Sequence, residues 1–182
     1  MEWKRVSETG AWLFREHKFL EWMQRRTSLL WIYGAAGARK TFLTPSVLGH
    51  FRLEGPPTAT GLTYMVAHHF FTKTSTPSSG DIIRLSLLAI VNQLCQDNPG
   101  YKRDIECWKP IVIAGTASSI WKQLFVDYFR DRPRALFLVL DGVDEIEDAN
   151  GLRYTDRDLL DLMRDLRGEW IGSGLLDFSN EK

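Results

Sequence analysis

Residues 34 to 41, with the sequence GAAGARKT, carry most of the groups that bind a phosphate. A phosphate-binding loop has the pattern G-x-x-x-x-G-K-[ST], and its backbone N–H groups surround the anion at the start of a helix. Lys40 would then contact the β- and γ-phosphates, and the hydroxyl of Thr41 would bind Mg²⁺. The residues expected to contact the nucleotide are Gly34, Ala35, Ala36, Gly37, Ala38, Arg39, Lys40 and Thr41.

A second group of candidate residues follows the apolar run ALFLVL at residues 135–140. Such a run is typical of a buried strand, and ligands of open α/β sheets bind at the carboxyl ends of the strands. Asp141 would hold Mg²⁺, directly or through water, and Asp144 or Glu145 could polarise an attacking water as general base. A strand that ends in a polar turn also explains the segment DGVDE, because Asp-Gly is a common turn signal.

The elements around both motifs alternate between strand and helix. Apolar runs predict strands over residues 28–33, 62–71 and 135–140. Apolar residues at helical spacing predict one or two short helices in 11–26 and further helices over 40–53, 81–96, 117–130 and 155–167.

This alternation predicts an α/β fold with a mostly parallel sheet flanked by helices. With a motif at the end of each of two strands, the best account is a three-layer P-loop NTPase. Pro45 is costly in the helix over 40–53 unless it lies in the first turn, and Asp81 is a plausible N-cap of the helix that follows.

Composition places the chain among ordinary globular proteins. Of its 182 residues, 44% are hydrophobic and 25% charged, and the formal net charge is zero, which gives no general attraction to nucleic acid or to an anionic membrane. Cys95 and Cys107 form no metal-binding or disulfide pattern, and no apolar run is long enough to span a bilayer. We therefore expect a cytoplasmic protein that binds neither nucleic acid nor membrane.

Several segments together resemble the NACHT-type nucleotide-binding domain of fungal STAND proteins, a nephrocystin-3-like N-terminal family. These segments are ETGAWLF, FLEWMQRRTSLLWIYGAAGARKTFL, HHFFTKTS, LLAIVNQLCQDNP and LFLVLDGVDE, and they extend over roughly residues 8 to 167. The resemblance implies a signalling ATPase fold that binds ATP or GTP with Mg²⁺ and switches between a closed monomer and an oligomer. It also implies self-association or attached effector and repeat domains as partners.

On this basis we divide the chain into three parts. Residues 1–27 are a helical lead-in, residues 28–168 a partial NACHT or P-loop NTPase core, and residues 169–182 a C-terminal tail. In the family a further strand with a Ser/Thr-Arg sensor follows the second motif and lies between the two motif-bearing strands. The segment GEWIGSGLLDFSNEK has no such pair. We therefore expect a sheet that is incomplete at the C-terminal end, and an isolated chain of poor stability.

Arg39 is the main departure from the phosphate-loop pattern, because the family has Gly before the Lys. A Gly lets the backbone approach the β-phosphate without a Cβ, whereas Arg adds a long side chain and strain of about 1–3 kcal/mol if the position needs Gly dihedrals. The guanidinium also attracts phosphate. We expect the steric effect to dominate and nucleotide binding to be weakened or lost.

Other polar residues suggest weaker hypotheses. His68 and His69 are adjacent in a strand and so point to opposite faces, which disfavours a shared metal. Arg130, Arg132 and Arg134 form either a solvated edge or a contact for a partner or acidic lipid.

Three functions remain open from the sequence. The first is a nucleotide-binding regulatory domain that is at most a slow NTPase. The second is a non-enzymatic pseudo-NTPase fragment that acts as an interaction scaffold, which Arg39 and the missing sensor region favour. The third is a metabolic or nucleic-acid kinase, for which we recognise neither lid arginines nor a substrate segment.

Overall fold

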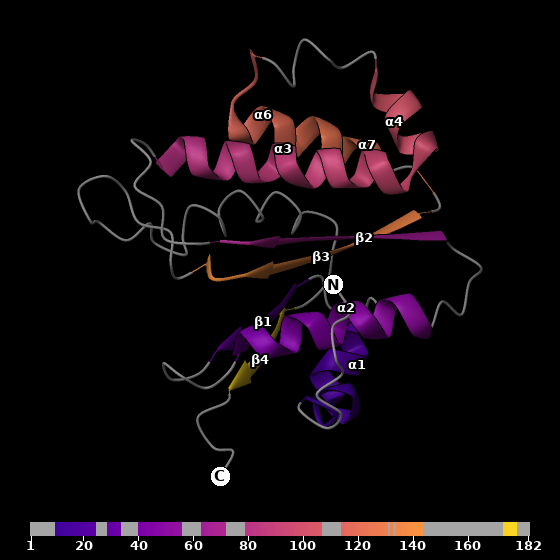
Figure 1. Cartoon of the computed structure of the whole chain (residues 1–182), viewed down its shortest axis with the longest axis vertical. Helices are drawn as coiled ribbons and strands as arrows, with labels where there is room; N and C mark the ends of the chain where they lie inside the picture. Colours follow the sequence, from indigo (N-terminus) through magenta and orange to yellow (C-terminus); the bar gives the residue numbers. More distant parts are fainter. Residues whose placement is uncertain are drawn as a thin grey trace, which may run out of the picture. The chain divides into compact units, whose positions relative to one another are not determined.

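The chain forms an α/β structure made of two compact units (Figure 1). Unit 1 comprises Met1–Thr60 with Glu169–Lys182, and unit 2 comprises Gly61–Gly168. Among the described residues, each unit contains one two-stranded parallel sheet. The computed structural model describes residues 10–24, 29–33, 40–55, 63–71, 79–106, 114–130, 132, 134–143 and 173–177.

Unit 1 contains the strand that precedes the phosphate loop and the helix that follows it. The predicted short helices, first strand and second helix are confirmed. The elements are η1 (Leu13–Arg15), α1 (His17–Met23), β1 (Leu29–Tyr33), η2 (Lys40–Phe42), α2 (Leu43–Leu53) and β4 (Ser173–Asp177).

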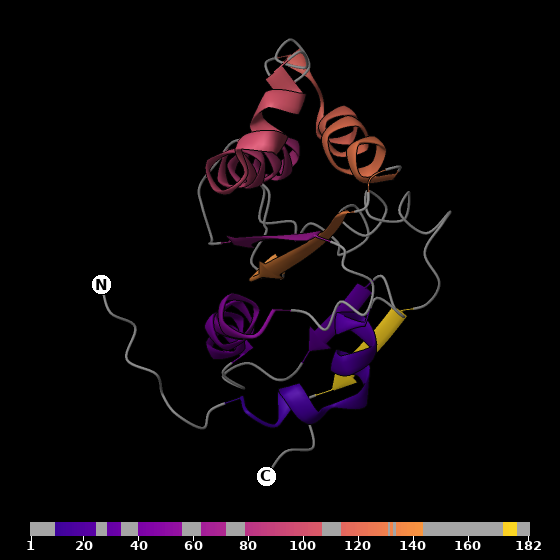
Figure 2. The ribbon, with the colours of Figure 1, turned by 90° about the vertical axis from the view of Figure 1, so that its right-hand side faces the viewer.

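Strand β4 follows the second motif, in the segment for which the sequence predicted only a C-terminal tail. It pairs in parallel with β1, from Leu29 opposite Ser173 to Tyr33 opposite Asp177 (Figure 2, yellow beside indigo). The absent Ser/Thr-Arg pair was a poor guide, because strand formation depends on backbone pairing and apolar side chains rather than on a sensor residue.

Pro45 is accommodated as the third residue of α2. The first N–H groups of a helix have no intrahelical acceptor, so a proline there removes no hydrogen bond. One turn of η2 leads directly into α2, and the hydroxyl of Ser46 donates to the Phe42 carbonyl at 3.3 Å.

The lead-in packs against α2 through aromatic rings. Phe14 stacks on His50 with centroids 4.6 Å apart, and Trp22 meets Phe51 edge-on at 5.9 Å. Stacked and edge-to-face pairs add to the stabilisation from burial. Among the described side chains of unit 1, the buried apolar ones are Leu13, Phe19, Met23, Leu43, Val47 and Phe51.

Unit 2 places its helices on one face of the second sheet (Figures 1 and 2). Its strands pair in parallel from Thr63 opposite Arg134 to Phe70 opposite Asp141. The elements are β2 (Thr63–Phe70), α3 (Ser79–Asp97), α4 (Pro99–Ile105), α6 (Ala117–Trp121), the π-helical segment η4 (Lys122–Asp127), α7 (Tyr128–Arg130) and β3 (Arg134–Asp141).

Most of the predicted elements of unit 2 are confirmed, but the proposed N-cap is wrong. Helix α3 begins at Ser79, so Asp81 already lies within it, whereas an N-cap residue keeps non-helical dihedrals. A side-chain N-cap is present on a different helix, α6, where the Thr116 side chain accepts a hydrogen bond from the Ser119 N–H at 3.3 Å. The helix predicted over 155–167 lies outside the described residues.

One hydrophobic core joins the sheet of unit 2 to its helices. Ala67, Leu94, Tyr101, Ile120 and Leu124 are fully buried within it. Within the described ranges, no helix is both long and apolar enough to cross a membrane.

Candidate functional site

The last two residues of the phosphate-loop motif lie at the start of a helix, as the sequence predicts. Lys40 and Thr41 form most of η2, which continues into α2, and Phe42 at the N-cap position of α2 provides no side-chain cap. Uncapped N–H groups at a helix start attract an anion. The other predicted contacts, residues 34–39, lie outside the described residues.

The chain segment before η1 packs against the first turn of α2. Gly10 has φ +96°, and a Cβ at this position would lie 2.9 Å from Cδ2 of Leu43. A non-glycine residue would be strained at this φ and would crowd Leu43. Gly10 therefore lets the lead-in lie close to the helix that begins at the phosphate loop.

Asp141 is the last residue of β3, which places its carboxylate at the carboxyl end of the strand as predicted. The backbone carbonyl of Asp141 accepts a hydrogen bond from the Phe71 N–H at 2.8 Å, so pairing with β2 continues to this residue. Oδ2 of Asp141 is buried and has no hydrogen-bond partner among the described residues. A buried carboxylate oxygen is costly unless it meets a donor, a water or a cation.

Gly142 forms the turn that follows Asp141. Its φ is +72°, and a Cβ at this position would lie 2.5 Å from the backbone oxygen of Phe71. Only glycine fits both the dihedral angle and the close approach. The Asp-Gly pair is therefore a tight turn that fixes the backbone next to Asp141, which agrees with the turn that this dipeptide commonly signals.

The predicted site residues fall in different units. Lys40 and Thr41 belong to unit 1 and Asp141 to unit 2. The two candidate general bases, Asp144 and Glu145, lie outside the described residues.

The two histidines of β2 have separate surroundings, as the strand alternation predicts. Nδ1 of His68 lies 2.9 Å from Nε2 of Gln93, whereas His69 meets the ring of Phe71 edge-on at 4.7 Å. Burial, and secondarily the charge of His68, lowers the pKa of His69. Nowhere in the described ranges do three His, Cys, Asp or Glu side chains gather as metal ligands would.

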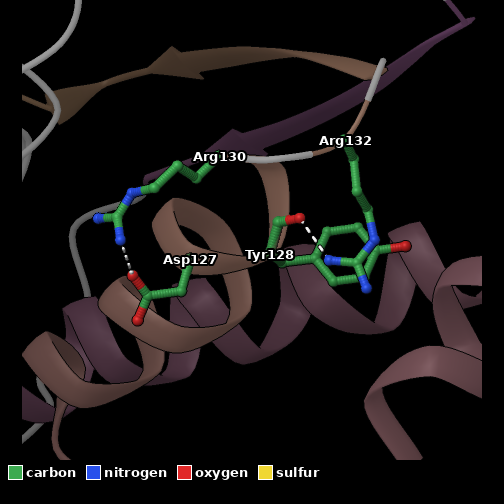
Figure 3. Close-up of polar contacts among 4 residues, drawn as sticks. All are labelled: Asp127, Tyr128, Arg130 and Arg132. Atoms are coloured by element: carbon green, nitrogen blue, oxygen red, sulfur yellow. Dashed lines mark hydrogen bonds and ion pairs between the residues drawn. The ribbon is translucent and has the colours of Figure 1, made fainter.

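The arginines at the start of β3 and just before it contact neighbouring groups of unit 2, and Figure 3 shows two of them, Arg130 and Arg132. Arg130 pairs with Asp127 at 3.1 Å, and Arg132 donates to the Tyr128 carbonyl at 2.6 Å while its guanidinium lies 3.9 Å from the centre of the Tyr128 ring. Nη1 of Arg134 donates to the Tyr128 hydroxyl at 2.9 Å. These contacts favour a structural role.

A tyrosine network in unit 2 was not foreseen from the sequence. Tyr101 is fully buried and donates to the Leu124 carbonyl at 3.0 Å, and Tyr128 donates to Asp104 at 3.0 Å. Burial raises the pKa of both phenols, and the Asp104 hydrogen bond raises that of Tyr128 further. No local motif signals these contacts, because their partners come from distant segments.

A comparison with family models identifies the chain. The model described as Nephrocystin 3, N-terminal matches residues 8–170. The chain belongs to this family.

The Nephrocystin 3, N-terminal match includes residues 8–27 of the lead-in, both motifs and the whole of unit 2. Strand β4 begins three residues beyond the matched range, which ends at residue 170 whereas β4 starts at Ser173. No curated protein and no solved structure matches the chain in the same comparisons.

Proposed function

We propose that this chain is a nucleotide-binding regulatory domain of a STAND or NACHT signalling protein, with ATP or GTP and Mg²⁺ as its ligand. The observation that carries the proposal is the buried Oδ2 of Asp141, which lacks a partner among the described residues at the carboxyl end of β3. The family match supports it, because it spans both motifs.

The donor set fits magnesium. Carboxylate and hydroxyl oxygens are the ligands that Mg²⁺ prefers, and the ion commonly keeps several waters. Asp141 and Thr41 would hold the ion, and Lys40 with the backbone of residues 34–39 would hold the phosphates. When bound, the ion would neutralise charge on the β- and γ-phosphates. Asp144 or Glu145 would orient an attacking water.

We further propose the three-layer P-loop arrangement for the fold. Two observations support it: both described sheets are parallel, and β1 has a parallel neighbour in β4. A strand beside β1 would complete the sheet that we expected to be incomplete at the C-terminal end.

Arg39 sets the expected strength of binding. Loss of close backbone approach at this residue would weaken nucleotide affinity about a hundredfold, which corresponds to about 2.7 kcal/mol. We therefore propose slow hydrolysis at most.

Titration of a fluorescent ATP analogue, with and without Mg²⁺, tests the proposal in three proteins: the natural chain, Arg39→Gly and Arg39→Gly with Asp141→Ala. We expect weak binding by the natural chain, about hundredfold tighter binding by Arg39→Gly, and loss of the Mg²⁺ dependence in the double variant. Equal tight affinity of the first two proteins would overturn the role of Arg39. Absence of binding in Arg39→Gly would overturn nucleotide binding itself.

A non-enzymatic scaffold is the second candidate function, and Arg39 favours it. Its partner would be a second copy or an effector or repeat domain of a longer protein. Turnover that is the same in Arg39→Gly and in its Asp141→Ala derivative would favour this function.

A further inference from the structure

The outer edge of β2 is contacted by a side chain of α3. N–H groups of a strand point alternately to its two sides. The Phe71 N–H bonds to Asp141 next to β3, so the N–H of His68, three residues earlier, points away from β3. That N–H donates to Oε1 of Gln93 on α3 at 2.9 Å.

The side-chain amide of Gln93 also contacts the imidazole of His68. Nε2 of Gln93 lies 2.9 Å from Nδ1 of the ring. A backbone N–H can only donate, so the amide must present its oxygen to the backbone and its NH₂ to the ring. Nδ1 must then accept, which places the single ring proton of a neutral imidazole on Nε2.

We propose that these two residues form a proton-sensitive latch between β2 and α3, closed only while His68 is neutral. We call this pair of hydrogen bonds the His68–Gln93 latch. A protonated imidazole carries hydrogen on both nitrogens and would place Nδ1–H against the amide NH₂. Rotation of the amide would satisfy the ring, but it would turn the NH₂ toward the backbone N–H. Either orientation leaves one donor facing another, so protonation opens the latch.

Among the described residues of β2, α3 and β3, the following titratable groups lie nearest the latch. On β2, His69 is adjacent, and its lowered pKa keeps it neutral longer as the pH falls. On α3, Asp97 lies one turn beyond Gln93 and is exposed. On β3, Leu138, Val139 and Leu140 are opposite Ala67 to His69, and the titratable residues Arg134 and Asp141 are at the two ends of the strand.

Opening of the latch would uncover the outward-facing N–H of His68 on the edge of β2. Unpaired groups on a strand edge are a template for pairing with another chain, and native proteins commonly block them. Gln93 would provide such a block at neutral pH and release it in acid.

Nitrogen-15 NMR of the full chain tests the latch without any substitution. At about pH 8, above the ordinary histidine pKa of about 6.5, we expect the His68 proton on Nε2. On acidification to about pH 5, the hydrogen-exchange protection factor of the His68 amide should fall about tenfold, the size expected for one hydrogen bond. A neutral ring protonated at Nδ1, or a protection factor that does not change, would overturn the proposal.

Gln93→Glu provides the sharper variant. A carboxylate can accept from both the backbone N–H and a protonated Nδ1, so the protection factor should hold or rise in acid. His69→Gln is the matched control, since it removes a neighbouring imidazole that does not form the latch, and it should keep the tenfold fall. The latch would be contradicted if the protection factor of the His68 amide fell in acid as much in Gln93→Glu as in the natural chain. It would also be contradicted if this fall disappeared in His69→Gln.

Discussion

The two units assemble their sheets from very different stretches of chain. In unit 2, β2 pairs with β3, and the chain between them supplies α3, α4 and α6, which cover the same sheet. In unit 1, β1 pairs with β4, so residue 29 pairs with residue 173 although all residues of unit 2 lie between them in the sequence.

This difference affects how each unit is stabilised. Unit 2 contains a continuous buried core from its own helices and strands. Unit 1 closes its sheet over a longer loop, which costs more chain entropy, and its β1 has β4 as the single partner among the described strands. Unit 1 should therefore depend on the end of the chain, whereas unit 2 should not.

Truncation after Gly168 should produce the largest effect. It removes β4 and with it the described partner of β1, so the hydrogen-exchange protection of residues 29–33 should be lost. At about 0.5–1.5 kcal/mol for each net hydrogen bond, several lost bonds are enough to unfold a marginal unit.

Residues 63–70 provide the internal control for the truncation, because β2 pairs within unit 2. Their protection should stay within a few-fold of the full chain. Equal loss of protection in both strands would contradict the independence of unit 2.

Two glycines offer a smaller and opposite pair of effects. Gly142→Ala in unit 2 should destabilise by about 1–3 kcal/mol, because Gly142 has φ +72° and a Cβ would meet the Phe71 carbonyl. Gly49→Ala in α2 should stabilise by about 0.5–1 kcal/mol, because a Cβ there meets nothing within 4 Å and alanine favours helix. Urea unfolding measures the free energy of unfolding of both variants. A lower stability of Gly49→Ala, or an unchanged stability of Gly142→Ala, would contradict the roles given to these two glycines.

The smallest expected effect is the pH dependence that His69 contributes to the stability of unit 2. Burial, and then the charge of His68, lowers the pKa of His69 from its ordinary value of 6.5. Between the lowered pKa and 6.5 the unfolded chain binds more protons than the folded chain, so the free energy of unfolding falls as the pH falls through this window. Above pH 6.5, the neutral His69 makes its full contribution to the free energy of unfolding.

Thermal unfolding from pH 8 to pH 5 measures this effect, and His69→Gln should flatten part of the curve. The first strand of unit 1, at residues 29–33, contains no histidine. Its exchange protection factor serves as the control. A curve for His69→Gln identical to that of the natural chain would exclude His69 as a contributor.

Much of the local structure could be predicted from residue patterns. Apolar runs located β1, β2 and β3 to within one or two residues, since buried parallel strands are apolar on both faces. Helical spacing located α2 and α3, although the first two residues of α3, Ser79 and Gly80, were missed. The prediction that Asp141 ends a strand is confirmed.

Residue patterns could not predict contacts between distant segments. Strand β4 is short and follows a long stretch of chain, so its pairing with β1 depends on which edge is available. In the sequence, Gln93 is a polar residue on a predicted helix with nothing to mark it as special. Its two contacts with His68 exist only because α3 crosses β2 at that point.

The sequence by itself determined the alternation of strands and helices around the two motifs and the resemblance to the family, and it identified the residues that we propose for phosphate and magnesium, because these depend on short-range spacing. The tertiary structure alone decided that β4 pairs with β1, that Gly142 must be glycine next to Phe71, and that Oδ2 of Asp141 is buried. Each of these depends on which distant backbone lies within a few ångströms, a quantity that local side-chain preference does not encode.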